Sequence, residues 1–278
     1  MGKPVYIHAG AHRTGTSSFQ MCLDLNRDAL HRAGYDTAYP GRDGIPGGTL
    51  RLQLPHKGDA AEVAGVLRQH SPDPGRALIL SEENIPGGMR LFFKSRFYPF
   101  AEHRLTALRA ACRALGAPEI ARVVLVVRSY DAFFASVYRK RAEDNPVSPF
   151  AELVPRFVAM RRGWPSIVRI FKRVLAPREL VVLDYGNRGS STALLRRLVP
   201  EVDLPLEEPG SSLNLSATDS ALDALQARYR AGEVLDRADR KAVIAAHAEM
   251  RETTGFASFP EAEKRILSER YQEHLDRI

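Results

Sequence analysis

Hydrophobic and polar positions alternate along the first two thirds of the chain in blocks typical of strands and amphipathic helices. Short runs of apolar residues, as found in strands buried on both faces of a parallel sheet, predict most of the strands. The predicted strands cover residues 5–9, 35–39, 77–80, 123–127 and 180–184. Between them, apolar residues at helical spacing predict helices over residues 16–33, 60–69, 100–115 and 166–175, and a helix beginning at residue 131.

This alternation of strands and helices predicts an α/β fold of the P-loop type, with a parallel sheet flanked by helices on both faces. From Ser216 onward the pattern is only helical, and Ser216 with Asp219 has the spacing of a capping box. We therefore expect a single domain over residues 1–278, with an α/β core over 1–200 and a helical C-terminal extension over 201–278. In such folds the ligand binds at the C-terminal ends of the strands.

The composition indicates a folded chain with a sizeable core, since 44% of its 278 residues are hydrophobic. No apolar run approaches the roughly 20 residues that span a bilayer, and no signal peptide precedes the first strand. We therefore expect a cytoplasmic protein with no transmembrane segment. Cys22 and Cys112 lack metal-like spacing and are predicted to be buried thiols.

The net charge of +7 suits an anionic cofactor or an acidic substrate, and it is also compatible with nucleic-acid binding. The chain has no zinc-finger spacing, no RNP-like strand and no long basic block, so no nucleic-acid partner is expected. Basic stretches at residues 139–141 and 161–162 are interpreted as solvated helix faces. The pattern does not predict an oligomeric state.

The segment between the first strand and the first helix has the layout of a phosphate cradle. Gly10 and Gly15 bound the loop and allow it to turn sharply, so that backbone N–H groups approach an anion. Thr16, Ser17 and Ser18 then open the helix, where their hydroxyls and the positive end of the helix dipole face the same point. The alternative is an ordinary corner whose serines only cap the helix.

The spacing of the two glycines is that of a nucleotide-binding P-loop, but Thr16 replaces the Lys that follows the second Gly. The only cation in the loop is Arg13. The order Arg13, Thr14, Gly15, Thr16, Ser17 resembles the 5′-phosphosulfate loop of PAPS-dependent sulfotransferases.

A second segment strengthens this resemblance. Arg128 stands at the end of a buried strand, and Ser136 follows eight residues later in the next helix. This arrangement resembles the one with which sulfotransferases hold the 3′-phosphate of PAPS. The alternative is a surface Arg paired with Asp131. Residues 81–84, 97–99 and 128–138 extend the resemblance to the bacterial sulfotransferase-like family over most of the first 200 residues, and residues 214–216 do so more weakly.

The resemblance implies a PAPS-dependent sulfotransferase with PAP as product, no metal requirement, and a hydroxyl or amine of a carbohydrate, lipid or small molecule as acceptor. Arg13 occupies the place of the family's usual Lys, and because a guanidinium does not readily donate a proton, His12 is a candidate for part of that role. The residues expected to bind the cofactor are Gly10, Arg13, Thr14, Gly15, Thr16, Ser17, Ser18, Arg128 and Ser136. No adenine-binding residue can be assigned, and residues 188–190 only loosely replace the family's Arg-Lys-Gly segment.

Two carboxylates follow the predicted strand over 77–80 and are candidate general bases. Glu83 is preferred because residues 81–84 match the family's Ser-x-Glu-Asn turn, whereas Glu82 equally suits a cap or an ion pair. His8 is predicted to be a core residue, and His56 is a weaker candidate. Aromatic residues that follow this pair line an acceptor pocket or form core; these are Phe92, Phe93, Phe97, Tyr98 and Phe100.

Two other functions remain open. A P-loop kinase or other NTP-dependent transferase is disfavoured by Thr16, and Asp184 is its only candidate magnesium ligand at a strand end. A non-catalytic nucleotide-binding protein would share the fold. The Gly- and Pro-rich stretch over residues 40–57 is a candidate substrate lid or wall in either case.

Overall fold

A five-stranded parallel sheet forms the centre of the protein in the computed structural model, which describes residues 2–54, 60–210 and 217–278. The strand order is β2-β3-β1-β4-β5, and every neighbouring pair is parallel. The strands are β1 (Val5–His8), β2 (Tyr35–Ala38), β3 (Ala77–Ser81), β4 (Arg122–Val127) and β5 (Glu179–Asp184). The predicted α/β class and all five predicted strands are confirmed, while the P-loop type stays a prediction.

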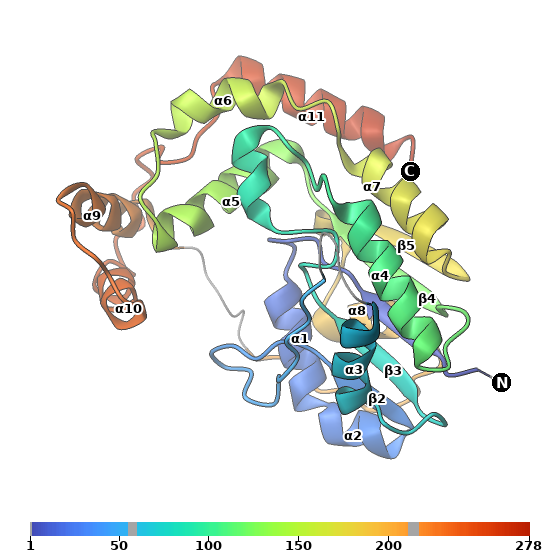
Figure 1. The fold of residues 1–278 in the computed structure, drawn as a ribbon. Helices are drawn as coiled ribbons and strands as arrows, with labels where there is room; N and C mark the ends of the chain where they lie inside the picture. The colour runs from blue at the N-terminus through green and yellow to red at the C-terminus, as the bar shows by residue number, and fades with distance from the viewer. Residues whose placement is uncertain (1, 55–59, 211–216) are drawn as a thin grey trace.

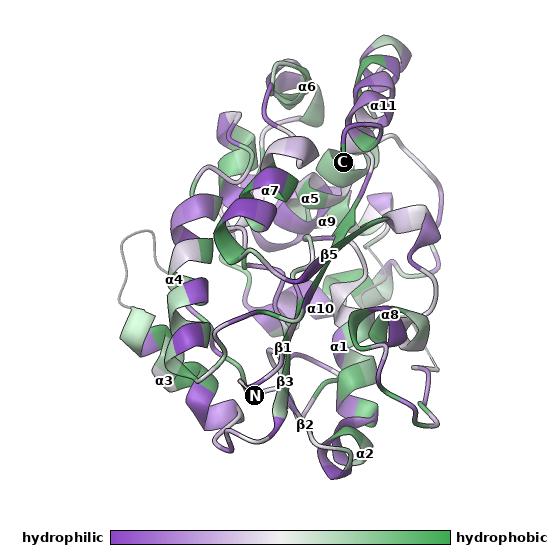
Figure 2. Ribbon diagram, turned by 90° about the vertical axis from the view of Figure 1, so that its right-hand side faces the viewer, coloured by the Kyte–Doolittle hydropathy of each residue, from purple (hydrophilic) through white to green (hydrophobic). Residues whose placement is uncertain are grey.

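Helices cover both faces of this sheet, which is seen edge-on in Figure 2. One face carries α1 (Thr16–Leu25), α2 (Arg27–Arg32) and α8 (Ser191–Leu198), and the other carries α3 (Ala60–His70), α4 (Ala101–Ala114) and α7 (Trp164–Ile170). Alternate strand residues supply the two cores, because successive side chains point to opposite faces. Val5 and Ile7 pack on the side of α3 and α4, whereas Tyr6 packs on the side of α1 and α8.

The helix predicted over residues 16–33 is broken at Asn26 into α1 and α2. The side-chain amide of Asn26 donates to the carbonyls of Cys22 at 2.7 Å and Glu207 at 2.8 Å. It thereby ties the end of α1 to a distant segment, and its own backbone leaves the helical region. The spacing of apolar residues along the chain does not reveal a contact between segments this far apart, so the break was not predicted.

Several elements have no counterpart in the sequence prediction. They are the 3-10 helix η1 (Met89–Lys94), α6 (Phe150–Val158), the 3-10 helix η3 (Tyr185–Asn187) and α8. Pro155 lies inside α6, where a proline normally argues against a helix. The helix predicted over 166–175 begins earlier, as α7, and ends in a π-helical turn, η2 (Phe171–Leu175). The helix predicted from residue 131 is α5 (Tyr130–Asp144).

The C-terminal part contributes α9 (Asp219–Arg230), α10 (Arg237–Ala246) and α11 (Glu261–Leu275). Helix α11 runs beside α6, and α9 and α10 lie together beyond the end of α5 (Figure 1). The predicted capping by Ser216 is wrong for α9, whose N-cap is Thr218, with its hydroxyl accepting from Ala221 N at 3.2 Å. Residues 214–216 themselves lie outside the described residues.

Two further predictions concern the whole chain. Among the described residues, no helix has both the length and the apolar character needed to cross a bilayer. Cys22 and Cys112 are both buried free thiols, as expected, and burial raises the pKa of each to about 12.

Candidate functional site

A pocket of about 510 Å³ lies at the C-terminal ends of the strands, within the size range of ligand sites. Its walls come from the loops that follow β1, β2, β3 and β4, from the segment after β5, and from α5 and α10. The segments that carry Arg13, Glu83 and Arg128 therefore all reach this pocket. This is the edge of a parallel sheet at which ligands are expected.

The loop after β1 turns through left-handed backbone at Gly10, Arg13 and Gly15, whose φ angles are 81°, 59° and 83°. The Gly15 position is also crowded, because a Cβ there would lie 2.8 Å from Cζ of Arg188, whose guanidinium would have to move aside. The guanidinium of Arg188 therefore rests directly on the backbone at the start of α1. A single glycine thus allows both the turn and the approach of a cation.

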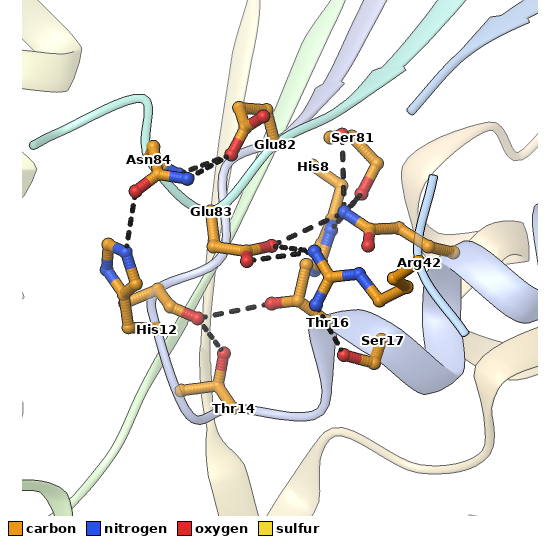
Figure 3. Close-up of polar contacts among 12 residues, drawn as sticks. His8, His12, Thr14, Thr16, Ser17, Arg42, Ser81, Glu82, Glu83 and Asn84 are labelled. Carbon is orange, nitrogen blue, oxygen red and sulfur yellow. Dashed lines mark hydrogen bonds and ion pairs between the residues drawn. The ribbon is translucent and has the colours of Figure 1, made fainter. Parts of the chain in front are cut away.

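The hydroxyls at the start of α1 divide into two groups (Figure 3). Thr14 and Thr16 donate to the Ala11 carbonyl oxygen, at 2.6 Å and 3.2 Å, and so stabilise the turn of the loop from within. Ser17 and Ser18 line the pocket, as does Thr16, and Ser17 Oγ accepts a hydrogen bond from Arg42. The predicted phosphate-facing role therefore suits the two serines better than Thr14, which is fully buried.

The two segments predicted to bind phosphates meet in this pocket. Arg13 Nε donates to Ser136 Oγ at 2.9 Å, and Arg128 Nη1 donates to the carbonyl oxygen of Arg13 at 2.9 Å. The Arg128 guanidinium also lies 4.7 Å from the ring centroid of Tyr185. These contacts hold Arg128 over the pocket, and Trp164 Nε1 fixes its backbone by donating to the Arg128 carbonyl at 2.8 Å.

The lining of the pocket is strongly basic. Six basic side chains face three acidic ones. The basic residues are Arg13, Arg42, Arg128, Lys140, Arg188 and Arg237, and the acidic residues are Asp43, Glu83 and Glu143. Within a concave site such a surplus of positive charge concentrates anions. Nη1 of Arg188 is buried and has no hydrogen-bond partner among the described residues, so this side chain retains a donor for an anion.

The two carboxylates after β3 differ sharply in their surroundings (Figure 3). Glu82 is buried and Oε1 accepts from Asn84 N and Asn84 Nδ2, both at 2.8 Å, so it caps the turn and does not line the pocket. Burial, together with the charge of Glu83, raises the pKa of Glu82. Glu83 lines the pocket and pairs with Arg42. Of the two, Glu83 is placed to reach a substrate.

His12 is held at both ring nitrogens. Nδ1 lies 3.0 Å from the Tyr98 hydroxyl and Nε2 lies 3.0 Å from Asn84 Oδ1. Because the Asn84 amide nitrogen donates to Glu82, its oxygen is the acceptor, and His12 is therefore protonated on Nε2 and accepts from Tyr98. Burial lowers the pKa of His12, so it is neutral near pH 7. This arrangement suits a residue that positions the turn after β3.

His8, His56 and three of the aromatic candidates lie in the core or outside the described residues. His8 is fully buried, contacts Ser81 Oγ at 2.9 Å and has its pKa lowered to about 3 by burial, in agreement with the predicted core role. His56 lies outside the described residues. In the aromatic cluster, Phe92, Phe97 and Tyr98 are buried, and Tyr98 packs edge to face against both phenylalanines, so the three form core and do not line the pocket.

Some lining residues were missed by sequence reasoning. Arg42 lies in the loop predicted as a substrate lid or wall, and Arg188 lies in the segment that loosely replaces the family's Arg-Lys-Gly segment. The sequence thus indicated these two segments but not the individual arginines. Lys140 belongs to a stretch predicted as a solvated face, yet it lines the pocket and pairs with Glu143 at 2.6 Å. Arg237 comes from α10, more than two hundred residues from the loop after β1.

No protein-family model matches this sequence, and no curated protein matches it either. The chemistry of the pocket therefore has to be inferred from its own residues.

Proposed function

We propose that this protein is a PAPS-dependent sulfotransferase that transfers a sulfuryl group to a hydroxyl or amine of an acceptor. The proposal requires one pocket that holds two separate phosphates of the same nucleotide, one at the start of α1 and one near Arg128. Since both cysteines are unpaired thiols, we also propose a reducing compartment such as the cytoplasm.

The observation that carries the proposal is the meeting of Arg13, Ser136 and Arg128. The Arg13 side chain reaches Ser136 Oγ at 2.9 Å, and Arg128 reaches the Arg13 carbonyl at 2.9 Å. The residues that resemble the 5′-phosphosulfate loop and those that resemble the 3′-phosphate site are thus in direct contact. Both segments follow the C-terminal ends of neighbouring parallel strands, β1 and β4, which is where ligands bind in sheets of this kind.

The chain's own residues can supply the necessary chemistry. Backbone N–H groups at the start of α1 and the hydroxyls of Ser17 and Ser18 would bind the phosphosulfate. Arg13 would neutralise the negative charge that develops on the leaving phosphate, as positioned donors do in phosphoryl transfer. Glu83 would accept the proton of the acceptor. Because the guanidinium stays charged, Arg13 acts here by electrostatics and not as an acid.

The remaining wall of the pocket indicates the kind of acceptor. Asp43, Lys140, Glu143 and Arg237 line it, and Met89 and Tyr185 are the only large apolar side chains in the lining as described. Such a wall matches an acceptor with many hydroxyl or charged groups, because an apolar acceptor would remove these charged side chains from water without offering them hydrogen bonds. A carbohydrate or a polar metabolite therefore fits better than a lipid.

The kinase alternative finds less support in the geometry. Asp184, its candidate magnesium ligand, accepts from Gly186 N at 2.9 Å through one oxygen and from the Tyr271 hydroxyl through the other. It ends β5 at the edge of the sheet and is not part of the pocket lining.

Thermal-shift titration with PAP, ADP and ATP, each with and without magnesium, tests the proposal. PAP should raise the melting temperature without magnesium, since the phosphate sites consist of N–H groups, hydroxyls and Arg side chains. A ligand at a hundredfold excess over Kd stabilises the native state by about 2.7 kcal/mol. Stabilisation by magnesium-ATP and not by PAP would refute the assignment.

A further inference from the structure

The side chain of Arg42 lies between the start of α1 and the carboxylate that follows β3 (Figure 3). Nη1 donates to Ser17 Oγ at 2.7 Å. Nη2 lies 2.9 Å from Oε1 and 3.1 Å from Oε2 of Glu83. One guanidinium therefore contacts both the proposed anion site and the candidate general base.

This ion pair makes Glu83 a poor proton acceptor in the free protein. The side chains of Arg42 and Glu83 are 26% and 16% exposed, so water and salt screen the pair only in part. Burial by itself would raise the pKa of Glu83, but the charge and hydrogen bonds of Arg42 outweigh it, with a contribution from His12, and hold the pKa below its usual value. A carboxylate with a lowered pKa is a weaker base.

One N–H group of Arg42 takes no part in the contacts with Ser17 and Glu83. Its Nε–H is buried and has no hydrogen-bond partner in the described part of the chain, although the residue lines the pocket. A buried donor without an acceptor is unfavourable, and an oxyanion in the pocket would satisfy it. Guanidinium groups bind such oxyanions through several N–H groups at once.

We propose that Arg42 senses the sulfuryl group of the donor and releases Glu83 only when the donor is bound. The inference rests on the proposed function. In the free protein Arg42 covers and neutralises Glu83. When the phosphosulfate lies at the start of α1, its sulfuryl oxygens compete for the guanidinium, which turns towards them and away from the carboxylate. Arg42 is thus a positioning residue that acts on the base and binds the transferred group.

Transfer of the sulfuryl group then follows. The acceptor oxygen forms a bond to sulfur, the bond between sulfur and the bridging phosphate oxygen breaks, and its electron pair remains on the phosphate of PAP. The acceptor's proton moves to the freed oxygen of Glu83. Before the donor arrives, the same carboxylate is occupied by Arg42 and does not activate water.

Calorimetric titration of PAPS and of PAP, without acceptor, tests this role in Arg42→Ala, Arg42→Lys and a control. The control is Arg51→Ala, which removes the same charge from an exposed side chain of the same loop. Arg42→Ala should weaken PAPS binding about 10- to 100-fold and change PAP binding by less than about threefold. Arg42→Lys should recover part of the loss, and Arg51→Ala should change neither ligand.

The masking of Glu83 is tested by a double-mutant cycle on the same measurement. Glu83→Gln removes the competitor for Arg42, so it should tighten PAPS binding about tenfold when Arg42 is present and clearly less in the Arg42→Ala background. Equal effects in the two backgrounds, or an Arg42→Ala variant that binds PAPS like wild type, would refute this inference alone. If wild type binds neither PAP nor PAPS, the proposed function itself fails. Should Arg42→Ala not fold, Glu83→Gln and Arg42→Lys still decide the outcome.

Discussion

Replacing Arg128 by Ala should separate binding of the 3′-phosphate from binding of the rest of the nucleotide. Charge-assisted hydrogen bonds contribute about 1.5–3 kcal/mol each, and truncating one partner of a charged pair costs about 2–5 kcal/mol. Arg128 is half-buried and already donates one bond to the Arg13 carbonyl, so we expect a loss of about 2–4 kcal/mol in PAP binding. This corresponds to a Kd roughly 30- to 1000-fold higher.

The substitution also removes contacts within the free protein. The bond to Arg13 and the contact with Tyr185 at 4.7 Å together stabilise the fold by about 2 kcal/mol. In a chain of this size that lowers the melting temperature by several degrees and leaves the protein folded at 25 °C. Binding can therefore be measured by calorimetry on a native variant.

Adenosine 5′-phosphosulfate provides the matched ligand, because it lacks the 3′-phosphate and its affinity should hardly change. Arg122→Ala provides the matched variant, since Arg122 stands at the other end of β4, where it bonds to the Arg197 carbonyl and pairs with Glu179. It should bind both ligands like wild type. Equal losses for PAP and adenosine 5′-phosphosulfate in Arg128→Ala would mean that Arg128 only supports the loop, and would refute the assignment of the 3′-phosphate site.

Three further predictions follow from the site and the core. Arg13→Lys should keep turnover within about tenfold of wild type, whereas Arg13→Ala should lose about a hundredfold or more, because only the charge is required; steady-state kinetics with a working acceptor measure both. Glu83→Gln should abolish turnover and Glu82→Gln should retain most of it, and the reverse order would exclude Glu83 as the base. Burial lowers the pKa of His8 from 6.5 to about 3, so only the unfolded chain takes up this proton between those values. This residue should consequently lower the free energy of unfolding by roughly 1.5 kcal/mol as the pH drops from 6.5 to 5. Urea titrations at the two pH values should show a smaller fall in His8→Gln than in wild type. The control His103→Gln, whose side chain is exposed, should show the same fall as wild type.

The strands and the location of the candidate pocket could be predicted from the sequence because both depend on local patterns. Buried strands such as β4 are continuous apolar runs, and a glycine-bounded loop at a strand end indicates a sharp turn where N–H groups gather. The prediction that Arg13 and Arg128 serve one site also drew on local signals, the spacing within each segment. Their contact through the Arg13 carbonyl then follows from β1 and β4 being neighbours in the sheet.

The parts that could not be predicted depend on contacts between distant segments. Asn26 breaks a helix because it bonds to Glu207, and Arg42 reaches Glu83 across the pocket, and neither pairing has a signal in the neighbouring residues. The same holds for His12, a candidate acid or base, whose ring nitrogens contact Tyr98 and Asn84, two residues far from it in the sequence. Aromatic residues after β3 were equally open to two interpretations, since burial and substrate contact demand the same side chains.

The contact between Trp164 and the Arg128 carbonyl has a practical consequence. Trp164 is the only tryptophan in the chain, it is fully buried, and its indole N–H bonds to the backbone of the residue assigned to the 3′-phosphate. Indole fluorescence responds to the polarity and hydrogen bonding of its surroundings, and here no second indole contributes to the emission. If Arg128 binds the 3′-phosphate as proposed, Trp164 is a built-in optical reporter of that subsite, and stopped-flow emission would follow the arrival of a nucleotide without any label.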